Sequence, residues 1–502
     1  MEWTPLLAAF GSILTPTGLL YIVGGGVLGM ILGAIPGLSG GTASVIILPL
    51  TYKMEPGLAL ALLASLYIGS TSGGCIGAIL LGIPGTGASI PTAWEGYPMA
   101  KKGQAVRALS IAVTCNFIGT LPGLIIAMFA CLPLSMVACK MGPWEYFSLL
   151  LLAVTMVVAL SKDNLMKGFV SVALALIISC VGSSPIDGAK RFTFGSSYLS
   201  GGVGMIVAML GIIAGRMIIE AYAFDKEVDV SIAGRVSKYK FPKKDLGENK
   251  SNILRSFLVG IFTGFLPALG GGVASMICYA NEKNRSPHPE TFNDGVTGEP
   301  AGIIACETTN NAVIGGALIP MISMGIPGSP ALIYMITALS IHGISCGPTL
   351  MRDHPDVVYL LYIACIFAAV AVLAAQTVGM PLFPMLLKVP SHFLYPAIIV
   401  VAFLGAFISQ GNLSGVVICL CFCLLGMAMR YFEIPDAPFM LTYCLATSIE
   451  TKLRQGLVNG YNGFWDFFTR PISCLFIILA VISLLYNLYG DKVKDKLSHA
   501  KA

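Results

Sequence analysis

The stretch Gly82-Ile83-Pro84-Gly85-Thr86 recurs in the second half of the chain as Gly325-Ile326-Pro327-Gly328-Ser329. Apolar sequence without a charged residue surrounds both copies. Each copy follows an earlier stretch rich in glycine and proline, at residues 33–41 and 264–272. Glycine and proline interrupt helices, and paired interruptions at corresponding places in two halves are typical of the binding site of a membrane transporter. We therefore expect four helix breaks in two matched pairs.

The composition of the chain indicates a membrane protein. Of its 502 residues, 56% are hydrophobic and 11% are charged, whereas an ordinary soluble domain has roughly 25% charged residues. Uncharged runs such as 308–351 and 389–429 exceed the roughly 20 apolar residues that one transmembrane helix needs. We expect an all-α integral membrane protein with about 10–12 transmembrane helices, whose paired broken or re-entrant helices meet near the middle of the bilayer. The net charge of +5 fits Lys and Arg at loop ends and gives no indication of a nucleic acid.

The second half of the sequence resembles the first over most of its length. The linker between the halves is rich in Lys and Arg, which predicts that it lies on the cytoplasmic side. The loop after the breaks is more basic in the first half, which favours inverted repeats, but the Lys-rich C-terminal tail argues against them, so parallel repeats stay open. The predicted domains are a first membrane repeat (1–221), a polar basic linker (222–252), a second membrane repeat (253–490) and a short charged tail (491–502).

Broken helices expose backbone N–H and C=O groups at membrane depth, where only protein or a water-filled cavity can surround them. N-terminal ends of half-helices suit a carboxylate, and exposed carbonyl oxygens with Ser, Thr and Asn side chains suit Na⁺. The alternative is that the breaks only kink packed helices. The predicted substrate-binding residues are Ser39, Gly40, Gly41, Gly85, Thr86, Gly271, Gly272, Gly328 and Ser329. The predicted Na⁺ ligands are Ser70, Thr71, Asn310 and Asn311.

One acidic residue, Glu307, precedes these asparagines in an otherwise uncharged segment. Ionisable residues at membrane depth are costly and are functional by default, so Glu307 is the candidate for coupling transport to a cation or proton. A helix cap or a helix interface is the structural alternative for Glu307, as interhelical hydrogen bonding is for the asparagines. Arg191 is either an attractor for an anionic substrate or a residue that reaches the lipid headgroups. No cofactor is expected.

The sequence gives less support to other classes of protein. Gly37-Leu38-Ser39-Gly40 fits the pattern of an intramembrane serine protease, which would need a histidine such as His342 to activate Ser39. The second half has Gly270 at the corresponding place, so the repeat accounts for these glycines without a nucleophile. The sequence has no phosphate-binding loop with the Gly-Lys-Ser/Thr ending, hence no sign of ATP as the energy source. A carboxylate channel of the same architecture stays an alternative.

The motifs together resemble the large membrane subunit of the tripartite tricarboxylate transporters, the TctA family. The resemblance extends over nearly the whole chain. The segments that carry it are Leu32–Leu38, Leu80–Gly85, Glu95–Ala100, Arg191–Gly195, Gly298–Pro300, Glu307–Asn311, Gly325–Gly328 and Phe468–Ser473. Glu95 stands where the family usually has Asp, and Ser39-Gly40 stands where Gly-Pro is usual.

The resemblance implies a permease and no enzyme. Such a permease receives a tri- or dicarboxylate, citrate being one example, from a periplasmic solute-binding protein (TctC-like). It works with a small membrane subunit (TctB-like) in the inner membrane of a bacterium. A gradient of Na⁺ or H⁺ drives symport, and an elevator-like movement of the break-bearing helices is the expected mechanism.

Overall fold

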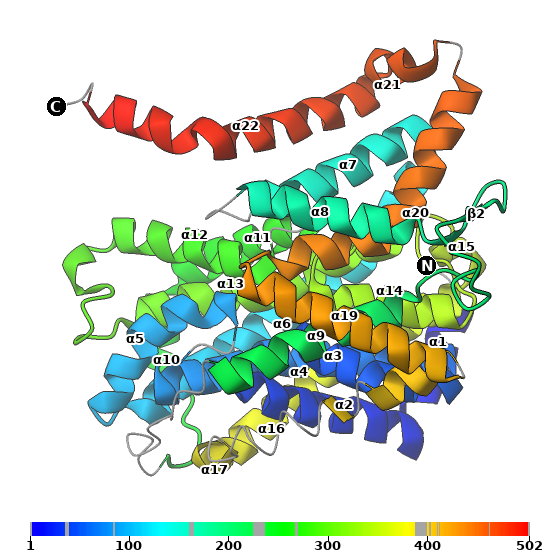
Figure 1. Ribbon diagram of the computed structural model, residues 1–502. Helices are drawn as coiled ribbons and strands as arrows, with labels where there is room; N and C mark the ends of the chain where they lie inside the picture. The colour runs from blue at the N-terminus through cyan, green and yellow to red at the C-terminus, as the bar shows by residue number, and fades with distance from the viewer. Residues whose placement is uncertain are drawn as a thin grey trace. The chain divides into compact units, whose positions relative to one another are not determined.

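The computed structural model describes residues 3–35, 40–83, 86–159, 165–223, 236–266, 270–386, 399–400, 403–408, 410, 412–460 and 462–499. Most of these residues lie in helices (Figure 1). Among them, the β-structure is a two-residue antiparallel pair, β1 (Gly182–Ser183) and β2 (Lys190–Arg191). The all-α prediction is confirmed.

The chain divides into two compact units that do not follow the two halves of the sequence. Unit 1 consists of residues 1–136 and 224–398, and unit 2 of residues 137–223 and 399–502. Each half of the sequence therefore contributes its first part to unit 1 and its second part to unit 2. The predicted domain boundaries remain a prediction about the repeats, since the two units cut across them.

Unit 1 contains the helices on both sides of every predicted break. Its helices are α1 (Trp3–Ile13), α2 (Pro16–Ala34), α3 (Gly40–Ile47), η1 (Leu48–Lys53), α4 (Pro56–Leu81), η2 (Gly87–Ser89), α5 (Ile90–Lys101), nearly all of α6 (Ala105–Ala138), α10 (Lys243–Glu248), α11 (Lys250–Phe265), α12 (Gly270–Arg285), η4 (Pro289–Thr291), α13 (Pro300–Met324), α14 (Pro330–Ile341), α15 (Leu350–Asp353), α16 (Pro355–Gly379), η5 (Met380–Leu382) and α17 (Phe383–Leu386).

Unit 2 is smaller and contains none of the predicted breaks. Its helices are α7 (Pro143–Ala159), α8 (Leu165–Ser179), α9 (Met205–Ala223), α19 (Leu413–Tyr431), α20 (Asp436–Asn459), η6 (Gly463–Trp465), α21 (Asp466–Thr469) and α22 (Pro471–His499). Within it, α9 packs against α19, and α7 packs against α20 and α22.

Five helical segments of the described chain are long and apolar enough to cross a membrane. They are α2, α4, α6, Pro355–Met385 and α19, and a pair bent by 87° at Arg470 would make a sixth. The 25-residue α13 is also long enough for a bilayer, but the polar run Glu307–Asn311 lowers its hydropathy. The multi-pass membrane class is supported, and the larger number of 10–12 spans remains a prediction.

Helices α2 and α4 pack with their backbones in contact, and so do α11 and α13. A Cβ atom added to Gly29 would lie 2.3 Å from the carbonyl oxygen of Leu66, and one added to Gly33 would lie 2.1 Å from that of Ser70. The corresponding glycines of α11, Gly260 and Gly264, would each meet a carbonyl oxygen of α13 at 2.6 Å. Small residues allow this close approach of membrane helices.

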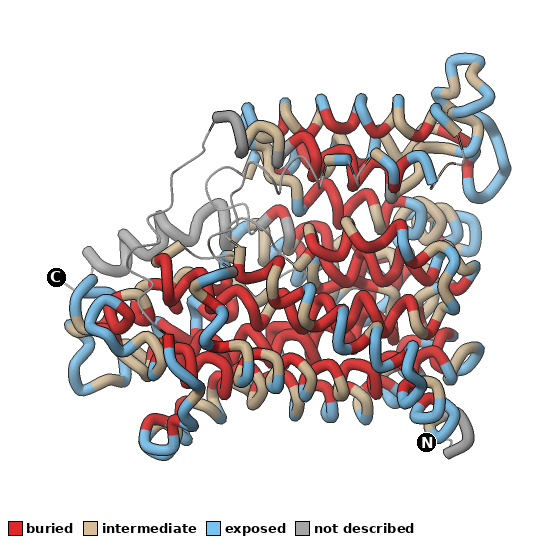
Figure 2. The backbone as a smooth tube through the Cα atoms, turned by 90° about the horizontal axis from the view of Figure 1, so that it is seen from below, coloured by how far each residue is buried: buried red, intermediate tan, exposed pale blue. Residues whose placement is uncertain are grey.

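Burial extends around the full circumference of the central helices of unit 1. Nearly every residue of α4 and of α13 is buried, and long buried stretches of backbone are visible in Figure 2. A helix that is buried on all sides belongs to the protein core instead of facing lipid on one side. The polar residues of α4 and α13 therefore lie inside the protein.

Candidate functional site

The two later breaks have the same backbone conformation. Helix α4 ends at Gly82 (φ 69°, ψ 10°) and α13 ends at Gly325 (φ 72°, ψ 23°), both in the left-handed region that favours glycine. The N–H group of Gly82 donates to Ala78 and that of Gly325 to Met321. The sequence prediction of a helix end at both motifs is correct, and the reason is a left-handed C-cap.

The chain is extended where it re-enters a helix after each of these breaks. Thr86 (φ −137°, ψ 161°) precedes η2, and Ser329 (φ −151°, ψ 160°) precedes α14. Neither hydroxyl accepts a capping hydrogen bond from its own helix. Part of each first turn is already satisfied, since the Leu332 and Ile333 N–H groups donate to the Ser329 carbonyl oxygen and the Ser89 N–H donates to that of Thr86. The polar capacity that remains lies in the hydroxyls and in the first N–H groups that these bonds do not use.

The two earlier breaks also match. Helix α2 ends before Ile35 (φ −81°, ψ 124°) and α11 ends before Leu266 (φ −80°, ψ 123°). The next helices begin with glycines, at Gly40 in α3 and Gly270 in α12. Predicted tip residues Ser39 and Gly85 lie outside the described residues, as do Pro36–Leu38, Pro84 and 267–269.

The predicted substrate and cation residues lie side by side at both earlier breaks. A Cβ added to Gly40 would lie 2.6 Å from Ser70 Oγ and 3.5 Å from the Tyr67 ring. A Cβ added to Gly271 would lie 2.1 Å from Asn310 Oδ1. Each glycine therefore makes room for a polar side chain of the neighbouring broken helix. Gly41 is buried at the start of α3, and Thr71 follows Ser70 half-buried on α4.

The breaks of the two halves also contact each other within unit 1. Helix α12 packs against η2, where Gly272 is near Gly87 and Gly271 is near Ala88. Helix α3 packs against α14, the helix that follows Gly328 and Ser329. Each earlier break of one half thus lies beside the later break of the other half. The helices that flank the four predicted breaks therefore meet within unit 1.

Asn310 and Asn311 occupy different environments. Asn310 is buried beside Gly271, and its Nδ2 has no hydrogen-bond partner among the described residues. Asn311 is fully buried, and all its polar atoms are used: Nδ2 donates to Asn116 Oδ1 at 2.8 Å and to the carbonyl of Glu307 at 3.0 Å. Of the two asparagines, Asn310 alone has an amide group without a partner among the described residues, and it lies beside Gly271.

The side chain of Asn311 joins a neutral network of hydroxyls and amides. Its Oδ1 accepts hydrogen bonds from Ser72 Oγ at 2.8 Å and from Thr120 Oγ1 at 3.2 Å. The carbonyl oxygen of Ser72 accepts from Asn116 Nδ2 at 3.1 Å and from Gln376 Nε2 at 2.9 Å. We define these five residues, Ser72, Asn116, Thr120, Asn311 and Gln376, as the amide network. It connects α4, α6, α13 and α16.

The predicted coupling residue, Glu307, is a fully buried carboxyl group with one neutral partner. Its Oε1 accepts a hydrogen bond from Thr92 of α5 at 2.6 Å, and its Oε2 has no partner among the described residues. Burying an unpaired carboxylate costs far more than burying a carboxylic acid. Glu307 therefore suits a role in which it gains and loses a proton or a cation.

Glu95 is a second buried carboxyl group, and its contacts could not be predicted from the sequence. Its Oε1 accepts from the Tyr279 hydroxyl and from the backbone N–H of Asn293, and its Oε2 accepts from the N–H of Glu299 at 2.7 Å. These bonds fix the loop between α12 and α13 to the middle of α5. Glu95 is thus a structural tie in unit 1, between the two halves of the sequence.

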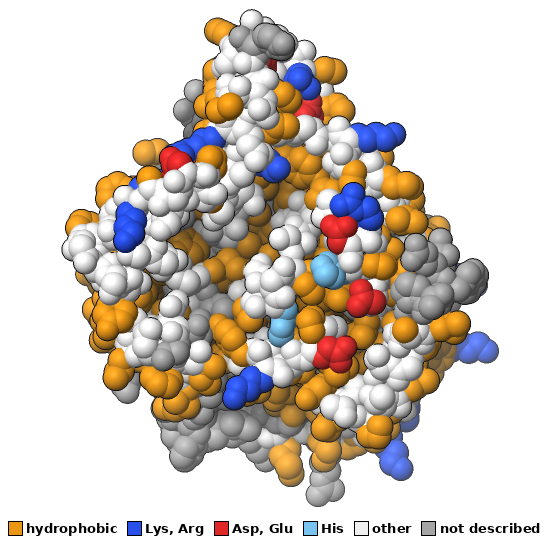
Figure 3. Space-filling model, turned by 90° about the vertical axis from the view of Figure 1, so that its right-hand side faces the viewer, with side chains coloured by type: hydrophobic (Ala, Val, Ile, Leu, Met, Phe, Trp, Pro, Cys, Tyr) orange, Lys and Arg blue, Asp and Glu red, His pale blue; other side chains and the backbone are white. Residues whose placement is uncertain are grey.

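A separate cavity of unit 1 has a charged lining. It has a volume of about 420 Å³ and is lined in part by Glu55, His342, His354 and Asp356. On the face of the molecule drawn in Figure 3, two histidine side chains lie among acidic ones. His342, the base that a protease would require, lines this cavity at the C-terminal end of α14. The charged cavity is chemically unlike the neutral breaks.

The TctA family model, described as the tripartite tricarboxylate transporter TctA family, matches residues 19–441. The chain belongs to the TctA family. The matched region contains all four breaks and the amide network. TctA is a transporter family, part of a tripartite system, which supports a multi-pass membrane permease and not an enzyme.

Two relatives of this TctA chain come from Agrobacterium vitis. The uncharacterized 52.8 kDa protein in the TAR-I ttuC' 3' region is 29% identical over 493 residues, which cover 97% of each chain. The uncharacterized protein in the TAR-II ttuC' 3' region is 25% identical over 229 residues, or 46% of this chain and 93% of the relative. No solved structure matches the chain.

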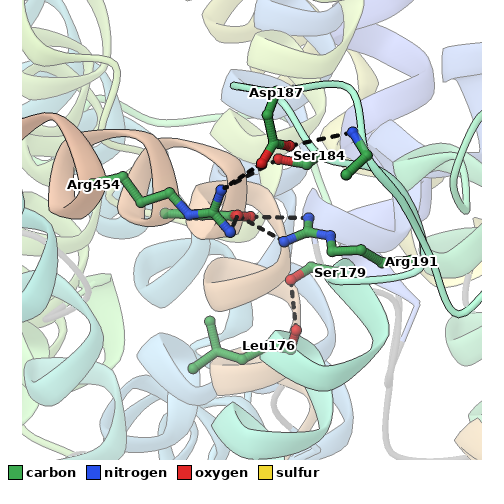
Figure 4. A network of polar contacts seen from close by, with 8 residues as sticks. Leu176, Ser179, Ser184, Asp187, Arg191 and Arg454 are labelled. Carbon is green, nitrogen blue, oxygen red and sulfur yellow. Dashed lines mark hydrogen bonds and ion pairs between the residues drawn. The ribbon is translucent and has the colours of Figure 1, made fainter.

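Arg191, which belongs to one of the TctA motifs, is paired within unit 2. Its guanidinium donates two hydrogen bonds to Glu450, at 2.7 and 3.1 Å. Arg454 contacts the same carboxylate at 3.0 Å and also Asp187 at 3.6 Å (Figure 4). We define Asp187, Arg191, Glu450 and Arg454 as the ionic network. Arg191 is committed to a carboxylate of its own chain, which leaves it unsuited to attract the substrate.

Sequence reasoning missed several functional candidates that the TctA structure brings together. Asn116, Thr120 and Gln376 are single polar residues in long apolar helices, and Thr92 is the partner of Glu307. Their polarity was the available signal, since placing a polar side chain at membrane depth costs free energy. Their partners could not be predicted, because they lie on helices distant in sequence.

Proposed function

We propose that this TctA-family chain is the large permease subunit of a secondary active transporter that imports a small organic carboxylate by symport with a cation. The substrate class is a tri- or dicarboxylate, with citrate as the first compound to test. Delivery is by a periplasmic solute-binding protein (TctC-like), and a small membrane subunit (TctB-like) completes the complex in the bacterial inner membrane. Membership of a tripartite family supports the need for these partners.

The observation that carries this proposal is the matched backbone of the two later breaks. Both have a left-handed glycine, an extended Thr86 or Ser329 whose hydroxyl caps no N–H of its own helix, and a first helical turn that leaves some N–H groups without a partner inside the helix. Such N–H groups and the positive end of the helix dipole favour a carboxylate. In this proposal the substrate contacts the tips at Ser39, Gly40, Gly41, Gly85, Thr86, Gly271, Gly272, Gly328 and Ser329.

The coupling cation is assigned to the same region. Ser70 and Asn310 each lie against the glycine of an earlier break, and with Thr71 they are the proposed Na⁺ ligands at the tips. Asn311, the fourth ligand expected from the sequence, has its side chain committed to the amide network. Glu307 supplies a carboxyl group with one free oxygen close to the asparagines in sequence. If H⁺ is the coupling ion, Glu307 is the group that carries it.

The movement proposed for transport follows from where the breaks are. All four belong to unit 1, and unit 2 contains none. Unit 1 would be the mobile part of an elevator, with unit 2 as the scaffold. The matched contacts of α2 with α4 and of α11 with α13 support two structural repeats, which we propose to be inverted, with about 10–12 spans in total.

The test is carboxylate uptake into proteoliposomes that contain the permease and its small membrane subunit, with the binding protein added. A panel of labelled tri- and dicarboxylates is compared with a Na⁺ gradient and with choline in its place at constant pH. We expect accumulation above the external concentration that requires both the binding protein and a cation gradient. Uptake without the binding protein, or equilibration without accumulation, would identify a channel and contradict the proposal.

A second measurement locates the site. Asn310→Ala removes the amide beside Gly271, and we expect uptake to fall by about tenfold or more, the scale of one lost polar contact to an ion. Ser65→Ala is the matched control, because the Ser65 hydroxyl bonds only to Ala61 of its own helix at 2.6 Å. Unchanged uptake by the Asn310 variant would remove this residue from the site.

A further inference from the structure

A small cavity lies in unit 1 next to the amide network. Its volume is about 10 Å³, which is enough for one body of the size of a water molecule. Four side chains of the amide network line it: Ser72 from α4, Asn116 and Thr120 from α6, and Gln376 from α16. The other lining residues are apolar. All four polar side chains are at least nine-tenths buried.

Almost all the hydrogen donors of these side chains already have acceptors. The hydroxyls of Ser72 and Thr120 both donate to Asn311 Oδ1. Asn116 Nδ2 donates to the Ser72 carbonyl and, at 3.7 Å, to Cys75 Sγ. Gln376 Nε2 also donates to the Ser72 carbonyl. These bonds leave one donor unused, the second N–H of the Gln376 amide.

Oxygen lone pairs are what the cavity has in excess. Each hydroxyl oxygen that donates to Asn311 keeps its own lone pairs. Asn116 Oδ1 accepts a hydrogen bond from Asn311 at 2.8 Å and retains a second lone pair. Gln376 brings a fourth oxygen, Oε1. Carbonyl and hydroxyl oxygens are the ligands of hard cations. A water molecule could donate hydrogen bonds to two of these oxygens at most, whereas a cation can contact all four.

We propose that this cavity binds one dehydrated Na⁺, held by the side-chain oxygens of Ser72, Asn116, Thr120 and Gln376. Asn311 is a positioning residue, because it accepts both hydroxyl hydrogens and thereby directs the oxygen lone pairs into the cavity. This inference rests on the proposed cation symport and gives it a second ion site, apart from the break tips. The small volume favours Na⁺ over the larger K⁺.

The position of the site supplies a mechanism for coupling. Ser72 is on α4 and Asn311 is on α13, the helices that end at Gly82 and Gly325. Helix α6 crosses α13 with its glycines against the backbone, since a Cβ added to Gly119 would lie 2.4 Å from the carbonyl oxygen of Thr308. An ion in the cavity would stabilise the arrangement in which α4, α6, α13 and α16 are packed. Loss of the ion would weaken that arrangement and release both later breaks.

The test uses the full-length chain purified in detergent, without substrate, binding protein or small subunit. Its melting temperature is measured against Na⁺ concentration, with choline and K⁺ replacing Na⁺ at constant ionic strength, and ²²Na⁺ binding is measured alongside. A ligand that binds the native state alone raises the melting temperature. We expect a Na⁺-specific rise that K⁺ does not reproduce.

Variants at one position separate an ion ligand from a packing residue. Thr120→Val keeps the shape but removes an oxygen, and we expect the Na⁺ midpoint to rise by about tenfold or more. Thr120→Ser keeps the oxygen and should bind Na⁺ like the native chain. Thr263→Val is the matched control, since the Thr263 hydroxyl bonds only to backbone carbonyls of its own helix α11. If Thr120→Val does not fold, Gln376→Met removes a different oxygen of the same cavity.

Two results would overturn the site. One is a native chain whose stability and ²²Na⁺ binding do not respond to Na⁺, which would mean that the cavity holds water. The other is a folded Thr120→Val or Gln376→Met variant with unchanged Na⁺ affinity. Because this experiment contains no carboxylate, a negative result would not contradict carboxylate uptake by the permease. Conversely, if the uptake experiment fails, the Na⁺-binding experiment still tests this site on its own.

Discussion

The amide network of unit 1 and the ionic network of unit 2 are built from opposite chemistry. The amide network has no charged side chain, and its members are at most 2% exposed. In the ionic network the side chains of Arg191 and Glu450 are each 22% exposed and that of Asp187 is 58% exposed. Its two cations and two anions compensate each other.

The difference follows from the cost of removing each kind of group from water. A buried charge pair loses more hydration than it regains unless its geometry is excellent, whereas neutral amides and hydroxyls can satisfy one another completely. The neutral network therefore connects the buried helices without placing a charged side chain in the core. The ionic network can only be maintained where water still reaches it. Four predictions test this contrast.

The largest effect on stability is expected when Asn311, the central residue of the amide network, is replaced. Asn311→Leu leaves Ser72, Thr120 and Asn116 without their partner in the core, and each buried unsatisfied group costs about 1–3 kcal/mol. We expect the free energy of unfolding to fall by about 3 kcal/mol or more, measured as a lower melting temperature in detergent.

Asn310→Leu is the control for Asn311→Leu, since the two residues are adjacent and equally deep. The Asn310 amide has an unused Nδ2, so its loss should cost clearly less stability. Equal losses from the two variants would show that burial, and not the hydrogen bonds of Asn311, sets the effect.

The next effect is on transport. Glu307→Gln keeps the shape of the side chain and its bond from Thr92 but abolishes its ability to ionise. We expect gradient-driven uptake to fall by about tenfold or more, in the range by which removal of a proton-transfer group slows a reaction, with little change in melting temperature. Glu450→Gln makes the same chemical change in the ionic network and should leave uptake unaltered. Normal accumulation by the Glu307 variant would exclude it from coupling.

A smaller effect concerns the stability contributed by the ionic network. Partly exposed ion pairs contribute about 0–1 kcal/mol, and salt screens them. Glu450→Gln should therefore cost less than about 1 kcal/mol at low salt and less still at high salt. The loss caused by Asn311→Leu should not depend on salt. A salt-independent loss in the Glu450 variant would mean that this network is effectively buried.

The smallest effect is local to the β1–β2 hairpin. Hydrogen bonds from Ser184 and from the Ala189 N–H, together with Arg454, hold the pKa of Asp187 below its usual value. A lowered pKa stabilises the fold at neutral pH, and this contribution is lost as the pH falls below the ordinary aspartate pKa of about 3.9. Asp187→Asn should speed amide hydrogen exchange at residues 184–191 at neutral pH and leave α20 unchanged. Faster exchange throughout unit 2 would argue against a local role.

The breaks were the part of the fold that the sequence could predict. Glycine and proline act through local backbone geometry, so Gly82 and Gly325 end their helices as expected. The division into two units could not be predicted, because it depends on contacts between segments that are far apart in the chain. The number of spans also depends on such contacts, since the buried α13 tolerates polar residues that a lipid-facing helix would not.

The candidate site was predictable in position but not in orientation. Asn310 and Asn311 look equivalent in the sequence, yet one step along a helix turns the side chain by about 100°. One therefore faces the break at Gly271 and the other faces α6. Asn116, Thr120 and Gln376 were missed because each is a lone polar residue whose partners are on other helices.

The glycine contacts between α2 and α4, and between α11 and α13, also limit how unit 1 can deform. With backbone against backbone, neither a lipid chain nor a water molecule can enter between the paired helices, so each pair behaves as one rigid rod. A larger side chain at any of these glycines would have to push the paired backbones apart. Helices α2 and α11 end at Ile35 and Leu266 with the same φ and ψ within 1°, so the two pairs share their end geometry as well as their glycine contacts.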